Sequence, residues 1–275
     1  MSLLDYARDD YSQNGEDGII ERIFSVVSDR PGLCCEFGAW DGIVLSNTRA
    51  LVERGWRGVM IEADPSKFAE LERNYADNPG VVCLQTMVDD SPNRLDGILD
   101  RAGISDRLDF LSIDIDGLDY YVFRSLDIRP VCVCVEAGGL HPPAEEDVVP
   151  RDVAAQNVGQ PLGAFVRMAE GLGYRLIAHT GNAFFLHEDA GAEDEFPTVE
   201  PVRAYEEFLA RLSREQREFL YRANLGFEQP GHRFRNPCLS RSALGVSPVR
   251  AAHGLMVSWG HRLASRVSGR VFGST

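Results

Sequence analysis

The stretch Leu33-Cys34-Cys35-Glu36-Phe37-Gly38-Ala39-Trp40-Asp41-Gly42 is an apolar run that breaks into an acid and two glycines. The apolar residues predict a buried strand, and the glycines let the backbone turn tightly without a Cβ clash. A ligand can then approach the main chain and the first amides of the following helix. The spacing differs from the G-x-G-x-x-G of a dinucleotide site. We predict a ligand hollow at this turn; the alternative is an ordinary turn of another α/β protein.

Strand and helix patterns alternate on the C-terminal side of this stretch. We predict strands near 33–37, 58–62, 81–85, 109–113 and 131–135, with helices near 46–54, 65–76, 92–102, 118–126 and 161–172. Two further strands, near 174–178 and 183–187, flank the short turn Thr180-Gly181-Asn182 and should be antiparallel neighbours. Regular alternation is typical of a parallel sheet with crossover helices on both faces. The predicted fold class is therefore α/β, with a Rossmann-like, doubly wound sheet.

The chain divides into four predicted parts. Residues 1–30 form an N-terminal capping helix, with Asn14 as N-cap and Glu16 and Asp17 in the first turn. The polar residues here either cap the helix alone or lie over the mouth of the hollow. The main domain covers 31–190. Residues 191–245 form a helical addition, either a lid or an arm whose apolar face could pair two copies, and 246–275 form a tail.

Composition and charge argue against several classes of function. The formal net charge of −14 argues against a nucleic acid substrate, because phosphates need a basic face. No run of about 18 apolar residues predicts a transmembrane segment, and no signal peptide is evident, so we expect a cytoplasmic protein. Five of the six cysteines lie in apolar strand patterns and should be buried thiols. The tail carries arginines and no acid after Glu228, which favours peripheral contact with an acidic partner or membrane surface, or a disordered or folded-back segment.

Acids follow each of the five predicted parallel strands. Ligands in such sheets bind beyond the carboxyl ends of the strands, so these acids are site candidates. Glu62, about 20 residues after the glycine turn, is placed to accept both hydroxyls of a ribose. Asp89 or Asp90 should lie near an adenine amine, unless it only caps a loop.

The acids at the ends of the fourth and fifth predicted strands are candidate catalytic residues. Asp114 and Asp116 follow one strand and Glu136 ends the next, and neighbouring strands lie about 4.8 Å apart. These three could hold Mg²⁺ or another hard cation. Without a cation, one of them could act as a base or position a substrate, or all could be structural. His141, in the loop after Glu136, is the first candidate for the proton-abstracting base; the alternative is a solvated loop histidine.

Several strings together resemble the FkbM-type S-adenosylmethionine (AdoMet) methyltransferases. They are Tyr11-Ser12-Gln13-Asn14-Gly15-Glu16-Asp17-Gly18-Ile19-Ile20, Glu36-Phe37-Gly38-Ala39-Trp40-Asp41-Gly42, Ser46-Asn47-Thr48, Gly58-Val59-Met60-Ile61-Glu62 and Ser112-Ile113-Asp114-Ile115-Asp116-Gly117. The resemblance covers about residues 8–190 and implies a seven-stranded sheet with one antiparallel strand.

The resemblance also implies a cofactor site. Gly38 and Gly42 would lie under the methionine part of AdoMet, Glu62 on its ribose, Asp89 near its adenine and Ser46 near its amino acid end. The full expected set is Gln13, Glu36, Gly38, Asp41, Gly42, Ser46, Glu62, Ala63, Val88, Asp89 and Asp114.

The implied activity is transfer of the AdoMet methyl group to a hydroxyl of a small glycosidic or polyhydroxy acceptor, with Asp114, Glu136 and His141 as catalytic residues. Related sugar methyltransferases hold a divalent cation with two adjacent acids after the fifth strand, whereas Ala137 follows Glu136 here. The alternatives are a different acceptor atom, a non-catalytic AdoMet-binding scaffold, and a metal-dependent enzyme that does not transfer methyl groups.

Overall fold

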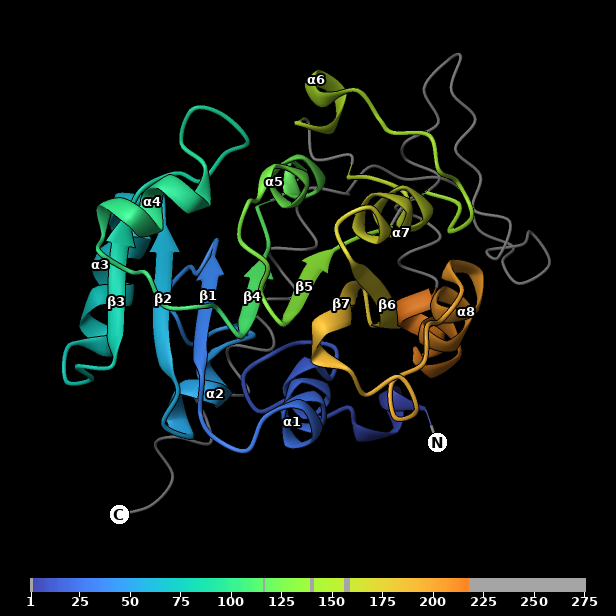
Figure 1. Ribbon diagram of the computed structural model, residues 1–275, viewed down its shortest axis with the longest axis horizontal. Helices are drawn as coiled ribbons and strands as arrows, with labels where there is room; N and C mark the ends of the chain where they lie inside the picture. The colour runs from blue at the N-terminus through green and yellow to red at the C-terminus, as the bar shows by residue number, and fades with distance from the viewer. Residues whose placement is uncertain (1, 116, 139–140, 156–158, 218–275) are drawn as a thin grey trace. The chain divides into compact units, whose positions relative to one another are not determined.

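The computed structural model describes residues 2–115, 117–138, 141–155 and 159–217 (Figure 1). One compact unit runs from Met1 to Arg211, and a second begins at Leu212. The predictions for residues 218–275, the basic tail among them, lie outside the described residues, as does Asp116. The first unit contains the whole sheet and every helix treated below.

The elements follow one another closely along the first unit. In chain order they are η1 (Leu3–Tyr6), α1 (Glu16–Val27), β1 (Leu33–Phe37), α2 (Arg49–Glu53), β2 (Arg57–Glu62), α3 (Pro65–Tyr75), β3 (Val81–Gln85), α4 (Leu95–Arg101), β4 (Phe110–Ile113), α5 (Asp119–Ser125), β5 (Cys132–Glu136), α6 (Arg151–Ala154), α7 (Leu162–Glu170), β6 (Tyr174–His179), β7 (Asn182–His187), η2 (Glu188–Ala190) and α8 (Pro201–Arg211). The predicted strands are confirmed to within one or two residues, and most helices are slightly shorter than predicted.

The seven strands form one sheet in the order β3-β2-β1-β4-β5-β7-β6, which Figure 1 shows from left to right. Every neighbouring pair is parallel except the two pairs that contain β7. The predicted Rossmann-like, seven-stranded sheet with one antiparallel strand is therefore confirmed. Because β3, β2, β1, β4 and β5 are parallel, their carboxyl ends share one edge of the sheet. The predicted acids therefore lie at or just beyond this edge.

Helix α1 begins differently from the prediction. Its N-cap is Gly15, with φ 95°, and not Asn14. A side chain at Gly15 would overlap Ala7, so only glycine lets the preceding loop fold back at this point. Glu16 and Asp17 do occupy the first turn, but they are buried, at 0% and 1% exposure. Both carboxylates therefore bind groups inside the protein.

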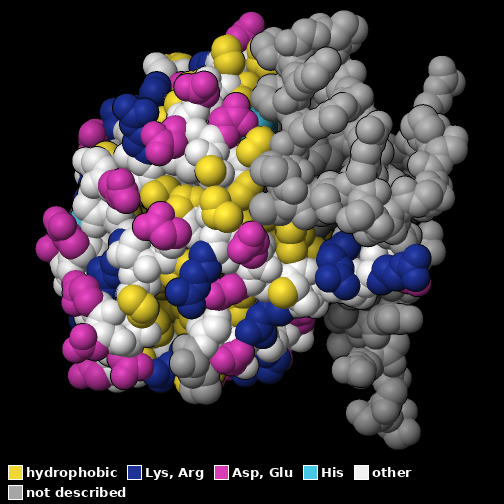
Figure 2. Space-filling view, turned by 90° about the vertical axis from the view of Figure 1, so that its right-hand side faces the viewer, with side chains coloured by type: hydrophobic (Ala, Val, Ile, Leu, Met, Phe, Trp, Pro, Cys, Tyr) yellow, Lys and Arg dark blue, Asp and Glu magenta, His cyan; other side chains and the backbone are white. Residues whose placement is uncertain are grey.

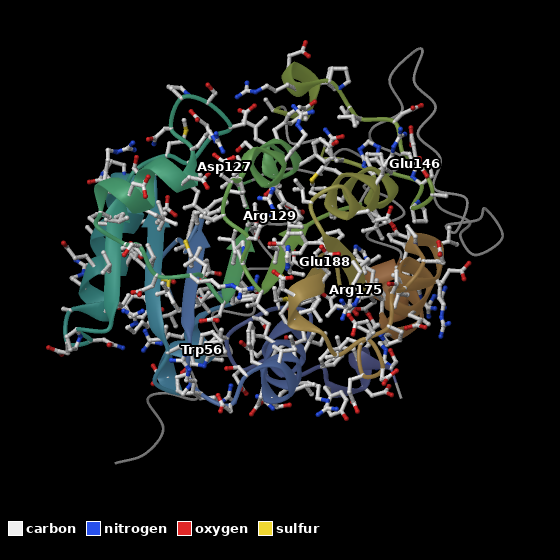
Figure 3. All side chains as sticks on the ribbon, in the orientation of Figure 1. Trp56, Asp127, Arg129, Glu146, Arg175 and Glu188 are labelled. Carbon is white, nitrogen blue, oxygen red and sulfur yellow. The ribbon has the colours of Figure 1, made fainter. Side chains whose placement is uncertain are left out.

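An aromatic cluster fixes α1 against the sheet. Phe24 of α1 packs edge-on against Trp56, with 4.7 Å between ring centroids, and against Phe110 of β4 at 6.0 Å. Figure 3 labels Trp56 near α1 and α2, at the opposite end of the strands from their carboxyl edge. The thiols of Cys34, Cys35, Cys132 and Cys134 are buried and free, as predicted, and burial raises their pKa; Cys83 is half-buried. This aromatic cluster therefore packs at the end of the sheet opposite to the carboxyl edge.

Helix α8 covers the edge strand β6 (Figure 1). Tyr205 and Leu209 are buried, so this part of the predicted arm uses its apolar face within the chain. No described helix has the length and apolar character needed to cross a membrane. On the face shown in Figure 2, acidic and basic side chains are mixed across the described part.

Candidate functional site

The turn after β1 passes directly against the end of β4. Gly38 has φ 74°, and a side chain there would overlap the carbonyl oxygen of Asp114. The Ala39 N–H donates to the carbonyl of Ile61 at 3.1 Å, which ties the turn to β2 as well. Glycine at position 38 is thus required by both conformation and close approach. The turn lies at the centre of the carboxyl edge.

Gly42 packs closely against helix α3. A Cβ at this position would lie 2.6 Å from a methyl carbon of Leu71 and 2.5 Å from the ring of Tyr75, both on α3. The Tyr75 hydroxyl donates to the Gly42 carbonyl at 2.9 Å. Asp41 Oδ1 accepts the N–H groups of Ile43 and Val44, at 2.9 and 2.8 Å. Gly42 and Asp41 thus pack against α3 and close the turn, and their contact with a cofactor stays a prediction.

Glu62 joins the end of β2 to the glycine turn. Its Oε2 accepts the N–H of Trp40 at 2.8 Å, and its Oε1 accepts the N–H of Asp64 at 2.7 Å. Trp40 has φ 50°, rare for a residue with a side chain, and its side chain is 52% exposed. The two sequence signals, the glycine turn and the acid 24 residues beyond its first glycine, are therefore one hydrogen-bonded unit.

The residues expected near adenine follow β2 and β3. Ala63 is exposed and Val88 is buried. Asp89 Oδ1 accepts the N–H of Asn93 at 2.8 Å, which closes the loop, and a contact of Asp89 with adenine stays a prediction. Asp90 pairs with Arg151 at 2.6 Å, and the Arg151 hydrogen bond holds the pKa of the Asp90 carboxyl below its usual range.

Glu36 binds three residues of the next loop. Its Oε2 accepts the hydroxyls of Ser46 and Thr48 at 2.6 and 2.7 Å, and its Oε1 accepts the N–H of Asn47 at 2.8 Å. Burial raises the pKa of Glu36 despite these hydrogen bonds. The Asn47 side chain also donates to the Ser112 hydroxyl on β4 at 3.1 Å. Asn47, Thr48 and Ser112 thus join the rim, although the sequence patterns singled out only Ser46 as a site residue.

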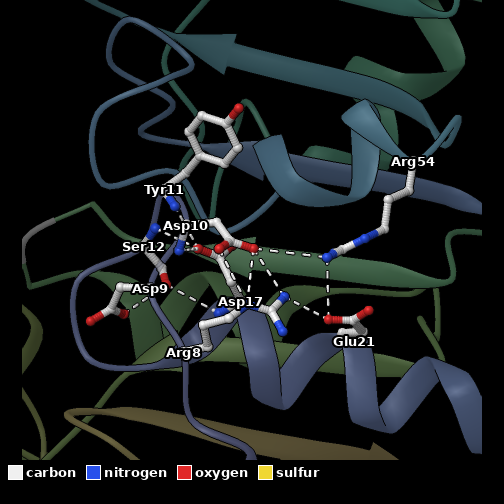
Figure 4. Close-up of polar contacts among 8 residues, drawn as sticks. All are labelled: Arg8, Asp9, Asp10, Tyr11, Ser12, Asp17, Glu21 and Arg54. Atoms are coloured by element: carbon white, nitrogen blue, oxygen red, sulfur yellow. Dashed lines mark hydrogen bonds and ion pairs between the residues drawn. The ribbon is translucent and has the colours of Figure 1, made fainter. Parts of the chain in front are cut away.

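The N-terminal loop is held by Asp17. Its Oδ2 accepts the N–H groups of Asp10, Tyr11 and Ser12, at 2.8, 2.6 and 2.8 Å (Figure 4). Its Oδ1 is buried and has no hydrogen-bond partner among the described residues. The negative charge of Asp17 contributes to the raised pKa of Glu36, so the two carboxylates lie within electrostatic reach of each other. Gln13, expected at the cofactor, is exposed on this loop.

The three proposed metal ligands do not form a described metal site. Asp114 is half-buried and Glu136 is exposed, and Asp116 is outside the described residues. Among the residues that are described, no group of three histidine, cysteine or acidic side chains is placed to hold a metal ion. The loop after β4 is instead held by Asp119, which accepts the N–H groups of Ile115 and Gly117 at 2.9 and 2.8 Å.

The loop histidine His141 is buried at 1% exposure, so the alternative of a solvated histidine is wrong. Its backbone N–H donates to the Gly138 carbonyl at 3.2 Å, which folds the loop back on the end of β5. His179, at the end of β6, contacts the Ala137 carbonyl through Nε2 at 2.9 Å, and burial lowers its pKa to about 4. Because a carbonyl only accepts, His179 Nε2 carries the proton.

A cavity of about 300 Å³ lies beside β6. It is lined by η1, β6, residues 195–199 and α8, with Leu4, His179 and Phe196 among its walls. Arg175, labelled in Figure 3, holds one wall by donating to the Phe196 carbonyl at 3.1 Å. None of the expected cofactor residues lines this cavity, so it is separate from the candidate site.

Comparison with protein-family models found no match, and comparison with curated proteins found none. Solved structures with a similar arrangement include the CMeT domain of the citrinin polyketide synthase, with 13% identity over 62% of this chain and 50% of that chain and a TM-score of 0.41. Monomeric WbdD matches at 16% identity over 66% of this chain and 42% of that chain, with a TM-score of 0.41. A putative caffeoyl-CoA O-methyltransferase from Staphylococcus aureus matches at 12% identity over 66% of this chain and 86% of that chain, with a TM-score of 0.43. The aligned part thus spans half of the first chain and less than half of the second. With TM-scores below 0.5, these likenesses do not decide what the chain binds.

Proposed function

We propose that the chain is an AdoMet-dependent methyltransferase that methylates a hydroxyl group of a small glycosidic or polyhydroxy acceptor. One observation carries this proposal: Glu62 and the glycine turn form a single bonded unit at the carboxyl edge of a parallel sheet, through the Trp40 N–H at 2.8 Å. Ligands of such sheets bind at this edge. The sequence resemblance to FkbM-type enzymes supports the same assignment.

The donor and acceptor groups of the rim fit this cofactor. A carboxylate has about four lone-pair positions, and the described hydrogen bonds to Glu62 use one on each oxygen. One position on each oxygen is left, which matches the two hydroxyls of a ribose. Asp17 Oδ1 is a buried acceptor without a described partner, and an ammonium group supplies donors of the kind it lacks. Acidic side chains also suit a cofactor that carries positive charge.

Bound AdoMet would supply a methyl group already activated by its sulfonium. The chain then has to align the acceptor oxygen and remove its proton. Asp114 and Glu136 end neighbouring strands and are assigned to orient the hydroxyl, and His141 is assigned as the base. His141 is buried, which keeps competing water away from such a group. Acceptor binding is assigned to the segment 138–165, of which residues 139–140 and 156–158 lie outside the described residues.

No step is assigned to Mg²⁺, because the described residues bring together no set of ligands for it.

We further propose that the chain acts in the cytoplasm on small molecules. The mixed charges on the face shown in Figure 2 contrast with the basic patch that a nucleic acid would require.

Two measurements on the full chain test this function. Calorimetry should detect AdoMet binding, and affinity after EDTA treatment should be unchanged. Mass spectrometry of a cell extract incubated with the enzyme and methyl-labelled AdoMet should identify a labelled small molecule. A chain that binds a divalent cation and not AdoMet would be the metal-dependent alternative, and the proposal would be wrong.

A His141→Asn variant tests the base. It should keep the AdoMet affinity and lose about two to four orders of magnitude in methyl transfer, the usual contribution of a general base. The matched control is His187→Asn at another buried histidine, whose Nδ1 accepts the Asp189 N–H at 3.2 Å away from the rim. If amide variants of Asp114 and Glu136 and the His141 variant all retain full activity, other groups catalyse the transfer. A wild-type chain that binds AdoMet and methylates nothing is instead a binding scaffold.

A further inference from the structure

Trp40 is an exception among the large apolar side chains of the first unit. Most of them are buried in the core, whereas 52% of Trp40 is exposed to solvent. Its φ of 50° lies in the left-handed region, which glycine adopts freely and a residue with a side chain adopts at a cost. Because the backbone conformation at this position favours glycine, we expect the indole ring of Trp40 to have a function of its own.

The position of Trp40 is set by the residue assigned to the ribose. The Trp40 N–H donates to Glu62 Oε2 at 2.8 Å, so the indole belongs to a residue that is bonded directly to that carboxylate. In a nucleoside the base is attached to the ribose. A group that holds the ribose hydroxyls at Glu62 thus brings the base close to the residues around this carboxylate.

One face of the indole is already in contact with a cation. Lys67 Nζ lies 4.5 Å from the ring centroid, a cation–π contact that orients the ring. Lys67 also pairs with Glu70 at 3.1 Å, so it is held from the side of α3. Because Lys67 occupies one face of the ring, a stacking ligand would use the opposite face. That face is large, flat and apolar.

A second exposed apolar side chain follows the neighbouring part of the edge. Met87, just beyond β3, is 63% exposed. β1, β2 and β3 are adjacent and parallel, so Trp40, Glu62 and Met87 follow the carboxyl ends of three successive strands. A flexible thioether and an aromatic ring on either side of a ribose-binding acid form surfaces suited to a flat heteroaromatic base.

We propose that Trp40 is the stacking platform for the purine base of the bound cofactor, with the indole face opposite Lys67 on the base. This proposal rests on the proposed function, because it takes the ligand at Glu62 to be AdoMet. It adds a specificity determinant that the glycine turn and the acids do not provide. Trp40 acts in binding and touches no reacting atom.

Fluorescence of the full chain tests the stacking. The chain has three tryptophans: Trp40 is exposed, Trp56 is 7% exposed, and Trp259 lies outside the described residues, so the Trp40→Phe variant is needed to assign a change to Trp40. AdoMet and adenosine should both quench the emission, and methionine alone should not, because it has no base. In the Trp40→Phe variant the quenching should disappear. If adenosine leaves the emission of the wild-type chain unchanged, or quenches Trp40→Phe as strongly, the proposal is overturned.

Affinity gives an independent readout. By calorimetry Trp40→Ala should bind AdoMet about ten- to a hundredfold more weakly, as expected when a base loses its aromatic partner, and Trp40→Phe should recover most of the affinity. Val82→Ala, at another exposed apolar side chain on β3, is the matched control and should be unchanged. AdoMet binding that is equally tight in Trp40→Ala and Val82→Ala overturns the stacking role alone. No AdoMet binding by the wild-type chain overturns the proposed function itself.

Discussion

The carboxylate of Glu16 accepts a hydrogen bond from the Thr180 hydroxyl at 2.8 Å, although 164 residues separate the two in the sequence. Glu16 Oε1 also accepts the side-chain N–H of Asn182 at 3.3 Å, and its Oε2 accepts the Asn14 N–H at 2.7 Å. The first residue of α1 is thereby bonded to the turn between β6 and β7. These hydrogen bonds attach the N-terminal segment to β6 and β7, the last two strands of the sheet order.

Replacement of Glu16 should destabilise the whole unit. In Glu16→Ala the buried donors of Thr180 and Asn182 lose their acceptor and a small cavity remains, so we expect the free energy of unfolding to fall by about 2–4 kcal/mol. Urea denaturation measures this value. Glu72→Ala, at an exposed glutamate of α3, is the control and should change stability by less than about 0.5 kcal/mol. Equal losses in the two variants would contradict the structural role of Glu16.

The stability of the chain should depend on the ionisation of Glu36. Burial raises its pKa in the folded state above the usual 4.5, so the folded protein binds this proton more tightly than the unfolded chain. The resulting stabilisation is fully present below about pH 4.5 and is lost as the pH rises through the folded pKa. The glutamine of Glu36→Gln does not titrate.

Urea denaturation across this range gives the test. The unfolding free energy of the wild type minus that of Glu36→Gln should therefore decrease from pH 4.5 towards neutral pH. A difference that stays constant, or increases, would show that the pKa of Glu36 is not raised.

Two glycines with the same backbone conformation should respond differently to a methyl group. Gly38 has φ 74° and faces the Asp114 carbonyl, whereas Gly103 has φ 70° and nothing within 4 Å of an added Cβ. Gly103→Ala should cost about 1–2 kcal/mol, the price of the left-handed conformation alone. Gly38→Ala should cost more and should also weaken AdoMet binding, because the turn has to move away from β4. Thermal unfolding and calorimetry check both values, and similar losses at the two positions would contradict the close approach at Gly38.

Removal of the Glu62 carboxylate should weaken AdoMet binding. Glu62→Ala loses the acceptor for two ribose hydroxyls and the anchor of the Trp40 N–H, and we expect the affinity to fall by about one to two orders of magnitude. Calorimetry measures the change, and Glu72→Ala again serves as the control. A circular dichroism melt shows whether the variant remains folded. Unchanged affinity in a folded Glu62→Ala chain would refute the ribose assignment.

The secondary structure could be predicted because its signals are local. Apolar runs of five or six residues marked the parallel strands, and the turn at Thr180 to Asn182 marked the antiparallel pair. The edge of the sheet that carries the site followed from strand direction, since parallel strands end on the same side. The start of α1 was predicted one residue too early, because the positive φ of Gly15 depends on the close approach of Ala7 from another part of the loop.

The sequence by itself thus determined the sheet, its carboxyl edge and the set of acids that follow the strands. Tertiary structure alone decided which donors each acid meets there. Glu36 and Glu62 lie at the ends of adjacent strands in similar patterns, yet Glu36 accepts three hydrogen bonds from Ser46, Asn47 and Thr48, while Glu62 accepts two, from the N–H groups of Trp40 and Asp64. The physical reason is that a carboxylate can bind a ligand only through acceptor positions that no nearby donor already occupies. Those donors come from distant segments of the chain, and a local sequence pattern does not show which segments come into contact.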